Sequence, residues 1–322
     1  MSTFGKNVDY IGNRKWFFGI SIAIMVIGLF INIFLGVKLD ISFKGGTLVK
    51  YSFEGTLDRE DVESFVQENL KKDVSVQISK SAADVKSILN ISLAESINLE
   101  EQKSLDQAVL SEYKDNKPKQ LDVSSLSPTM GRLFLLKCLV AIALASIFLV
   151  IYVALRFKKI GGLSAGAMAL VALLHDVLIA YFTFVVFRIP LDDNFVAVVL
   201  SILGFSLNDT IVIYDRIREN RKAMGKDASI GEIVNVSINQ SFSRSFNTSL
   251  CTFLAIGTVA VMAIAFNLDS IVSFAVPMMI GIISGCYSTI CICGPLWVIW
   301  QNHKEDKKKE QKEQRVGKKK RA

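Results

Sequence analysis

The chain has 322 residues, of which 51% are hydrophobic and 21 are phenylalanine, a composition untypical of a soluble globular protein. Its net charge of +7 does not indicate nucleic-acid binding, because ten of the 37 lysines and arginines lie in residues 301–322 and no RNA-binding module or zinc pattern accompanies them. All five cysteines fall in apolar blocks, which excludes a disulfide framework in the hydrophilic part and favours a packing role.

The first apolar block covers residues 16–37. As a helix it would extend about 33 Å at about 1.5 Å per residue, enough to cross a hydrocarbon core of about 30 Å. Arg14 and Lys15 precede it, as in a signal peptide, but the run is too long for a signal sequence and no small-x-small cleavage site follows. We therefore expect a retained membrane anchor after a cytoplasmic N-terminus, residues 1–15.

Residues 38–132 are hydrophilic and alternate between strand-like and helix-like segments. Four of these segments are predicted strands, of which the first alternates, and two are predicted helices, the first with Asp58 as a possible N-cap and its apolar residues on one face. The resulting order β-α-β-β-α-β is that of a ferredoxin-like domain. In chain order, the six segments are 47–55, 57–72, 73–79, 84–94, 98–114 and 119–126.

Five further apolar blocks follow, and the short joints after the third and fifth of the six blocks predict antiparallel helix hairpins. The last block contains Pro277, Gly281 and Gly285, so we expect it to be kinked or tilted. A cytoplasmic loop, 215–246, separates the fourth and fifth spans, and a basic tail, 301–322, ends the chain. The five blocks are 133–155, 161–187, 191–214, 247–266 and 271–300.

Basic residues gather on one side of these spans, which by the positive-inside rule places both termini in the cytoplasm and residues 38–132 outside. For the basic tail we expect a solvated, disordered segment, with contact to anionic lipid or a ribosome-like partner as the alternative. The opposite short loops carry Arg188, Asp192, Asp193 and Asp269. The basic side carries Lys6, Arg14, Lys15, Arg156, Lys158, Lys159, Arg216, Arg218, Arg221, Lys222, Lys226 and Arg244.

The predicted fold class is a polytopic α-helical membrane protein with six transmembrane helices and a small α+β ferredoxin-like extracytoplasmic domain between the first two. Ionisable residues inside such spans are functional candidates, because each costs about 2.5–3.5 kcal/mol at the bilayer centre. The fourth span holds Asn208, Asp209 and Thr210. Asp215 follows Asp209 by about 9 Å of helix, so the simpler interpretation places Asp209 near the cytoplasmic interface. That depth still leaves the carboxylate within the apolar slab unless neighbouring helices hydrate it, so we favour a functional role for Asp209.

Two other places carry intramembrane charge. Arg244 has no acid within a helical turn, so Asp209 is its nearest sensible partner, unless Arg244 extends to the interface. His175 and Asp176 lie near the middle of the third span, where they either extend a proton path or make a structural hydrogen bond between helices. His303 is the only other histidine, which argues against a metal site.

No enzymatic motif is present. The sequence lacks a nucleotide-binding P-loop, a Ser-His-Asp pattern and an H-E-x-x-H motif. Residues 43–47, "FKGGT", open the hydrophilic domain as a turn and not as a phosphate loop. We expect no cofactor, no metal and no enzymatic activity, and an energy supply from an ion gradient.

Several motifs resemble those of the SecF protein-export membrane proteins of the RND superfamily. The closest is "GFSLNDTIVIYDRIREN" (204–220), and "ISFKGGT", "LSPTMGR" and "ALLHDV" are similar to other motifs of the family. The resemblance covers residues 8–300. The chain departs from the family's pattern at Ser42, where an aspartate is usual, and at Leu126-Ser127-Pro128, which usually reads V-G-P.

The resemblance implies an accessory subunit that works with SecD and uses the proton-motive force to draw preproteins out of the SecYEG channel in the bacterial cell membrane, with YajC as a further partner. It implies that Asp209 is the intramembrane acid and Arg244 the essential arginine, with Asn208, Thr210, His175 and Asp176 in support. The extracytoplasmic motif falls on Phe43, Gly45, Gly46 and Thr47.

The hypothesis for the mechanism is a protonation switch in which protonation of Asp209 weakens its pairing with Arg244. Three rival interpretations remain. One is a proton-driven exporter half for small molecules or lipids, of RND type. Another is a passive scaffold that stabilises the channel, and the third is an intramembrane hydrolase, which lacks a paired catalytic set.

Overall fold

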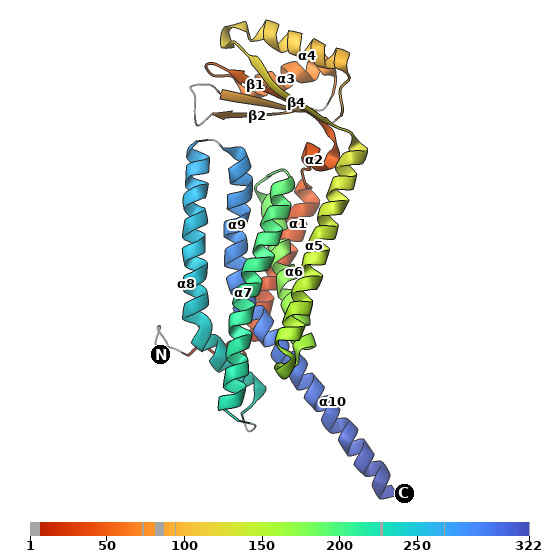
Figure 1. Cartoon of the computed structure of the whole chain (residues 1–322), viewed down its shortest axis with the longest axis vertical. Helices are drawn as coiled ribbons and strands as arrows, with labels where there is room; N and C mark the ends of the chain where they lie inside the picture. Colours follow the sequence, from red (N-terminus) through yellow and green to blue (C-terminus); the bar gives the residue numbers. More distant parts are fainter. Residues whose placement is uncertain are drawn as a thin grey trace.

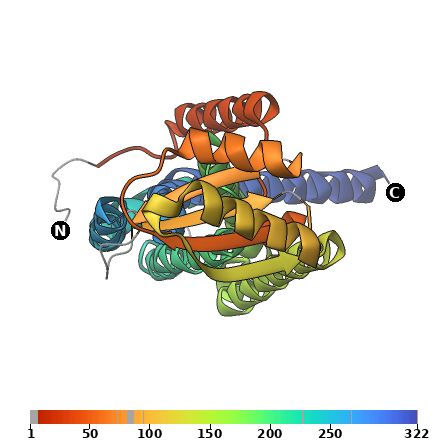
Figure 2. The same cartoon turned by 90° about the horizontal axis from the view of Figure 1, so that it is seen from above.

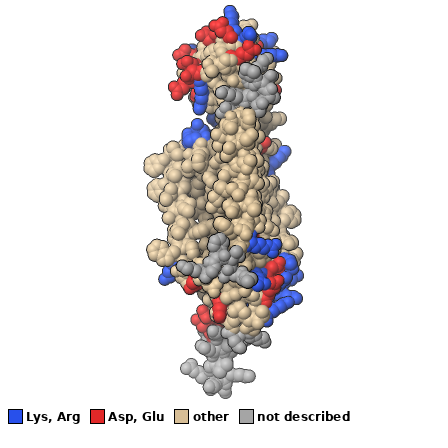
Figure 3. Space-filling model, turned by 90° about the vertical axis from the view of Figure 1, so that its left-hand side faces the viewer, with Lys and Arg blue, Asp and Glu red and all other residues tan. Residues whose placement is uncertain are grey.

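Figure 1 shows a bundle of long helices side by side beneath a small α+β domain, in a computed structural model that describes residues 7–72, 74–80, 87–93, 95–225, 228–266 and 268–321. Seen from above, the α+β domain lies over the ends of the helices (Figure 2). On the face shown in Figure 3, charged residues gather on this domain and at the opposite end of the molecule, and a broad uncharged belt separates them.

Six helices in the described part of the chain are long and apolar enough to cross a membrane, as the six apolar blocks predict. The sixth is formed by two α-helices in succession. A 3₁₀ turn, η2 (Lys158–Ile160), joins the second span to the third. The spans are α1 (Arg14–Leu35), α5 (Pro128–Arg156), α6 (Gly162–Val186), α7 (Asp193–Ala223), α8 (Ile230–Ala265), and α9 (Asp269–Ser288) with α10 (Gly294–Arg321).

The α+β domain has the predicted alternation of strands and helices. Its four strands form one antiparallel sheet in the order β2-β3-β1-β4. One face of the sheet packs against α3 and α4, with Val49, Tyr51, Leu89, Val62 and Val109 among the buried residues. After a single-turn helix α2 (Ile41–Lys44), the elements are β1 (Gly46–Phe53), α3 (Arg59–Leu70), β2 (Val74–Lys80), β3 (Ser87–Leu93), α4 (Leu99–Glu112), η1 (Lys114–Asn116) and β4 (Lys119–Leu126).

Local signals in the sequence explain where the domain's helices begin. The side chain of Asp58 accepts a hydrogen bond from the backbone N–H of Glu60 at 2.8 Å, which confirms the predicted N-cap of α3. Asn98 and Glu101 form a reciprocal capping box at the start of α4. At the start of α5, the Ser127 hydroxyl accepts from the backbone of Met130, and Pro128 occupies the first helical turn.

The helices at the charged end of the bundle are longer than their apolar blocks. α7 continues to Ala223 and α8 begins at Ile230, so the predicted loop 215–246 is wrong in extent and only residues 224–229 separate the two helices. The helices extend because their polar turns pack together: Asn220 Nδ2 donates to Ser237 Oγ at 2.9 Å. Two residues counted in the charge argument, Lys6 and Lys226, lie outside the described residues.

The sixth span is irregular, as expected, but the irregularity does not coincide with its proline. Pro277 lies inside α9, and the break is a π-helical turn, η3 (Thr289–Cys293), between α9 and α10. Such π-helical turns are a common cause of bends in long helices. Beyond it, α10 continues to Arg321, so the basic tail is helical in this structure and the expected disorder is wrong.

Candidate functional site

Polar side chains gather inside the bundle where α6, α7, α8 and α9 meet. Asp176 is fully buried and Asp209 is 2% exposed, although both lie in helices long and apolar enough to cross a membrane. An unpaired carboxylate is costly there, so the groups around each acid decide what it can do. The buried hydroxyl-bearing residues nearby are Ser206, Thr210, Ser245, Ser249, Ser284, Ser288 and Thr289.

Asp176 on α6 accepts hydrogen bonds at both carboxylate oxygens. Oδ1 accepts from Ser284 Oγ at 2.6 Å and lies 3.2 Å from His175 Nδ1. Oδ2 accepts from Ser206 Oγ at 2.8 Å and from Ser288 Oγ at 2.7 Å. These serines belong to α7 and α9, so Asp176 joins three helices. All of the roughly four acceptor positions of a carboxylate are used, which favours the structural hydrogen bond among the two interpretations of this residue.

Asp209 on α7 has fewer hydrogen-bond partners than Asp176. Within the described residues, the carboxylate of Asp209 accepts one hydrogen bond, from Ser249 Oγ on α8 at 3.4 Å. Arg244 lies within electrostatic range of the carboxylate, but the two groups form no ion pair within 4.0 Å. The expected direct pairing is therefore not made in this structure. Arg244 is exposed, because it lies about 100° around α8 from the buried Ser245.

The other predicted polar residues divide between the inside and the outside of the bundle. Thr210 is buried, donates to the backbone carbonyl of Ser206 at 3.0 Å, and lies 3.3 Å from the Thr289 hydroxyl. His175 Nε2 is buried without a hydrogen-bond partner in the described part of the chain. Asn208, in contrast, is exposed on the outer face of α7, so it does not join the interior cluster.

The motif at residues 43–47 lies apart from this cluster, at the joint between the α+β domain and α5. Gly45 has a φ of +83°, and a Cβ atom there would lie 2.5 Å from Pro128 Cα. A Cβ on Gly131 would lie 2.8 Å from Gly45 N, so the two segments meet at backbone distance. Phe43 is 1% exposed beneath this contact. The motif therefore connects the domain closely to the bundle.

The remaining motif residues, Gly46 and Thr47, lie in strand β1 of the sheet. Gly46 has a φ of +135°, and a Cβ there would lie 2.2 Å from the backbone oxygen of Leu93 on β3. Thr47 is fully buried, and its hydroxyl accepts from the backbone N–H of Ile97 at 3.1 Å. All four motif residues thus have packing roles, and none of them contacts the intramembrane acids.

Sequence reasoning missed most of the serines of the interior cluster. Ser284 and Ser288 stand four residues apart on α9, and Ser245 and Ser249 stand four residues apart on α8. This spacing places each pair on one helix face. Serines repeated at this interval inside an apolar block were the signal that would have identified them.

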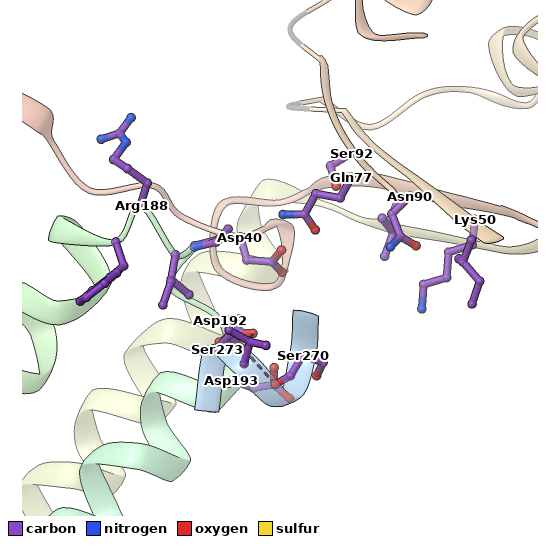
Figure 4. A pocket seen from close by; sticks show the side chains of 16 residues that line it. Asp40, Lys50, Gln77, Asn90, Ser92, Arg188, Asp192, Asp193, Ser270 and Ser273 are labelled. Atoms are coloured by element: carbon purple, nitrogen blue, oxygen red, sulfur yellow. Dashed lines mark hydrogen bonds between the residues drawn. The ribbon is translucent and has the colours of Figure 1, made fainter. Parts of the chain in front are cut away.

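A second polar concavity lies between the sheet and the ends of the helices (Figure 4). It has a volume of about 590 Å³. Asp192, at the end of the bundle, has a carboxyl pKa raised by burial, and the neighbouring Asp193 and Asp40 raise it further. From the sheet, the polar lining residues are Lys50, Gln77, Asn90 and Ser92; from the bundle end, they are Asp40, Arg188, Asp192, Asp193, Ser270 and Ser273.

Comparison with known proteins places these features in a family. The model of the C-terminal region of the protein export membrane protein SecD/SecF matches residues 106–303. The chain is 35% identical to the protein translocase subunit SecF of Calditerrivibrio nitroreducens, over 90% of this chain and 93% of that protein. It is 31% identical to the protein translocase subunit SecDF of Bacillus subtilis, over 91% of this chain but only 38% of that protein.

Solved structures of SecDF share the fold. The structure from Thermus thermophilus, described as a translocon-associated membrane protein, superposes with a TM-score of 0.78 at 25% identity, covering 94% of this chain and 40% of that chain. A SecDF in a super-membrane-facing form gives a TM-score of 0.63 at 24% identity, covering 97% and 41%. This chain thus spans about two fifths of each SecDF. From the family match and the SecF relatives together, the chain belongs to the SecD/SecF family of protein-export membrane proteins.

Proposed function

We propose that this chain is a SecF-type accessory subunit of the Sec translocase, which uses the proton-motive force to promote export of preproteins through SecYEG. The observation that carries the proposal is the state of Asp209, a buried acid with a single long hydrogen bond in the described part of a membrane bundle. A carboxylate with so few partners is free to gain or lose a proton, whereas Asp176, which accepts from three serine hydroxyls and lies beside His175, is not.

Proton binding at Asp209 would act through the contact between α7 and α8. Burial disfavours a charged carboxylate and the nearby Arg244 favours it, so the balance depends on how close the two groups are. Neutralising Asp209 removes the attraction to Arg244 and allows α7 and α8 to repack. One proton crossing about 150 mV releases about 3.5 kcal/mol, which shifts a two-state equilibrium several hundred-fold.

The proposal includes an orientation. The end of the bundle with most basic residues lies in the cytoplasm of a bacterial cell, together with both termini, and the α+β domain lies outside the cell membrane. The sheet order β2-β3-β1-β4 supports classifying this domain as ferredoxin-like. The domain would receive motion from the bundle through the close contact between Gly45 and Gly131.

The proposal also includes partners. The Bacillus subtilis relative is a SecDF of which this chain matches only part, which supports a SecD-type chain as the other half. Asn208 and Arg244 are exposed on neighbouring helices that are long and apolar enough to cross a membrane, and a partner helix that covers them would remove polar groups from lipid. SecYEG, YajC and unfolded preproteins are proposed on the family alone. No cofactor or enzymatic step is part of the proposed mechanism.

Export measured with and without a proton gradient tests the proposal. Asp209→Asn should assemble normally and lose the part of export that depends on the gradient, because asparagine cannot carry the proton. Asp215→Asn is the matched control, since Asp215 lies on the same helix but pairs with Arg156 and Arg218 at the basic end of the bundle. Normal gradient-dependent export by a stably inserted Asp209→Asn variant would contradict the proposal.

A further inference from the structure

A line of four buried serines runs along α8 from Asp209 towards the basic end of the bundle. Ser249, Ser245, Ser241 and Ser237 stand four residues apart and are 6%, 2%, 5% and 0% exposed. They therefore lie on one face of the helix and extend over about 18 Å. Ile213 and Ile217 of α7 and Ile238 of α8 belong to one buried hydrophobic cluster of the bundle. We refer to the four serines as the serine line.

Both ends of the serine line contact polar groups of α7. At one end, Ser249 Oγ donates to Asp209 Oδ2 at 3.4 Å. At the other end, Ser237 Oγ accepts from Asn220 Nδ2 at 2.9 Å. Asn220 also donates to Gln240, which accepts from Arg216, a side chain that is 42% exposed. The line thus connects the buried acid with the surface at the basic end.

Ser245 gives the serine line a free hydroxyl. A serine or threonine within a helix usually donates back to the carbonyl four residues earlier, as Thr248 and Thr252 do on the same helix at 2.9 Å. Ser245 Oγ does not: it is buried and has no hydrogen-bond partner in the described part of the chain. A buried hydroxyl in this state has full capacity to bind a water molecule, both as donor and as acceptor.

The spacing of the serines also fits water. Neighbouring hydroxyls of the line are about 6 Å apart along the helix, too far for a direct hydrogen bond. One water between each pair would make two bonds of about 2.8–3.0 Å. We propose that the serine line binds a chain of water molecules that carries protons between Asp209 and the basic end of the bundle. This inference rests on the proposed proton-coupled function.

Proton movement along this chain is balanced. Asp209 releases one proton to the first water, each water and the hydroxyls of Ser249, Ser245 and Ser241 pass one proton on as they receive one, and the last water releases a proton to the solvent near Arg216. Ser237 keeps its own proton, because its Oγ donates to the backbone carbonyl of Ile233 at 2.6 Å. No serine changes its charge. The charged or titratable groups nearest the path are Cys286 beside Asp209, Arg216 at the far end, and Arg244, which lies within electrostatic range of Asp209 from the exposed face of α8.

Proton flux tests the inference independently of export. The chain is purified with its native membrane partner, reconstituted in vesicles, and followed with an internal pH-sensitive dye under a potassium and valinomycin clamp. Ser245→Val should reduce the flux by about tenfold or more, the size of effect expected for one lost hydrogen bond in the path. Ser245→Thr, which has the same shape as valine but keeps a hydroxyl, should retain the flux. Thr248→Val is the matched control.

The outcomes separate the two proposals. If Asp209→Asn leaves the flux unchanged, the proposed function fails. If Asp209→Asn abolishes the flux and Ser245→Val keeps it, only the water path fails. Ser245→Cys tests the water path without a flux measurement. In a protein whose five native cysteines have been replaced, the thiol of this variant should react with a small water-soluble methanethiosulfonate reagent added at the basic end. No reaction at Ser245→Cys overturns the water path.

Discussion

Asp176 and Asp209 are two buried acids of one helical bundle, and Ser206 of α7, which hydrogen-bonds to Asp176, lies less than one turn before Asp209. Asp176 has four polar neighbours within 3.2 Å, whereas Asp209 has one hydrogen bond, of 3.4 Å, among the described residues. The same membrane environment therefore holds one acid in a fixed set of contacts and leaves the other nearly free. Within the proposed function, Asp176 therefore holds the helices in position, and Asp209 is the acid that binds and releases the proton.

The first prediction concerns Asp176. Asp176→Asn places an NH₂ group, which only donates, against serine hydroxyls that already donate, so two of the present hydrogen bonds are lost. Each lost buried bond costs about 1–3 kcal/mol. We expect a lower thermal stability of the purified protein, measured by scanning fluorimetry in detergent.

Two single serine substitutions are the controls for the stability measurement on Asp176→Asn. Ser284→Ala removes one donor to Asp176 and should destabilise the protein by less than Asp176→Asn. Ser201→Ala removes an exposed hydroxyl from α7 and should leave the stability unchanged. Equal stability of Asp176→Asn and wild type would show that the hydrogen bonds of Asp176 do not hold the helices together.

The second prediction concerns the joint between the domain and the bundle. Gly131→Ala adds a Cβ that would lie 2.8 Å from Gly45 N and 2.9 Å from the Phe43 carbonyl oxygen, so the backbone must move. Overpacking of this kind costs typically about 1–3 kcal/mol. We expect faster proteolysis of residues 38–46 in Gly131→Ala. Gly19→Ala, also in a membrane helix, is the control, because its Cβ meets nothing within 4 Å.

The third prediction is a pH dependence confined to the α+β domain. Glu101 accepts from Lys72 Nζ at 2.8 Å and from the backbone N–H of Asn98 at 3.0 Å, and these bonds lower the pKa of its carboxyl. A lowered pKa in the folded state adds stability that is present above the unfolded value of about 4.3 and is lost as the pH falls through the folded value.

Hydrogen exchange of the α4 amides between pH 3 and pH 7 measures this contribution, after correction for the intrinsic exchange rate. Protection in wild type should decrease at the acid end of this range, and Glu101→Gln should lack the Glu101 part of the decrease. Glu100→Gln is the control, since Glu100 is an exposed acid in the same helical turn. An identical pH profile in wild type and Glu101→Gln would contradict the assignment.

Much of this architecture was predictable from the sequence, because apolar length fixes the spans and alternation fixes the strands. The six spans and the order of the domain's elements follow from local pattern. The environments of the two acids do not follow from local pattern, since that of Asp176 depends on how α7 and α9 face α6, and that of Asp209 on how α8 faces α7. Ser284 is 108 residues from Asp176, and only tertiary packing brings the two together.

The same limit applies to Arg244. Although Arg244 lies within electrostatic range of the Asp209 carboxylate, the sequence suggests a direct pairing that this structure does not contain. It does not predict that Ser245 and Ser249 form the buried face of α8, which turns Arg244 outward. The predicted loop 215–246 was wrong for a related reason, because the polar contact between Asn220 and Ser237 sustains both helices beyond their apolar blocks.

The fourth prediction uses this outward position of Arg244. Arg244 makes no ion pair with Asp209 in this structure, so the proposed coupling between them acts through charge, and Arg244→Lys should retain gradient-dependent export whereas Arg244→Gln should lose it. Arg218→Gln removes a charge from α7 that pairs with Asp215 at the basic end of the bundle, and it should have little effect on gradient-dependent export. The measurement is preprotein export into vesicles with and without a proton gradient, at equal levels of inserted protein. If Arg244→Lys loses export as fully as Arg244→Gln, the guanidinium group itself is required, and a direct pairing with a carboxylate must form at another stage of the cycle.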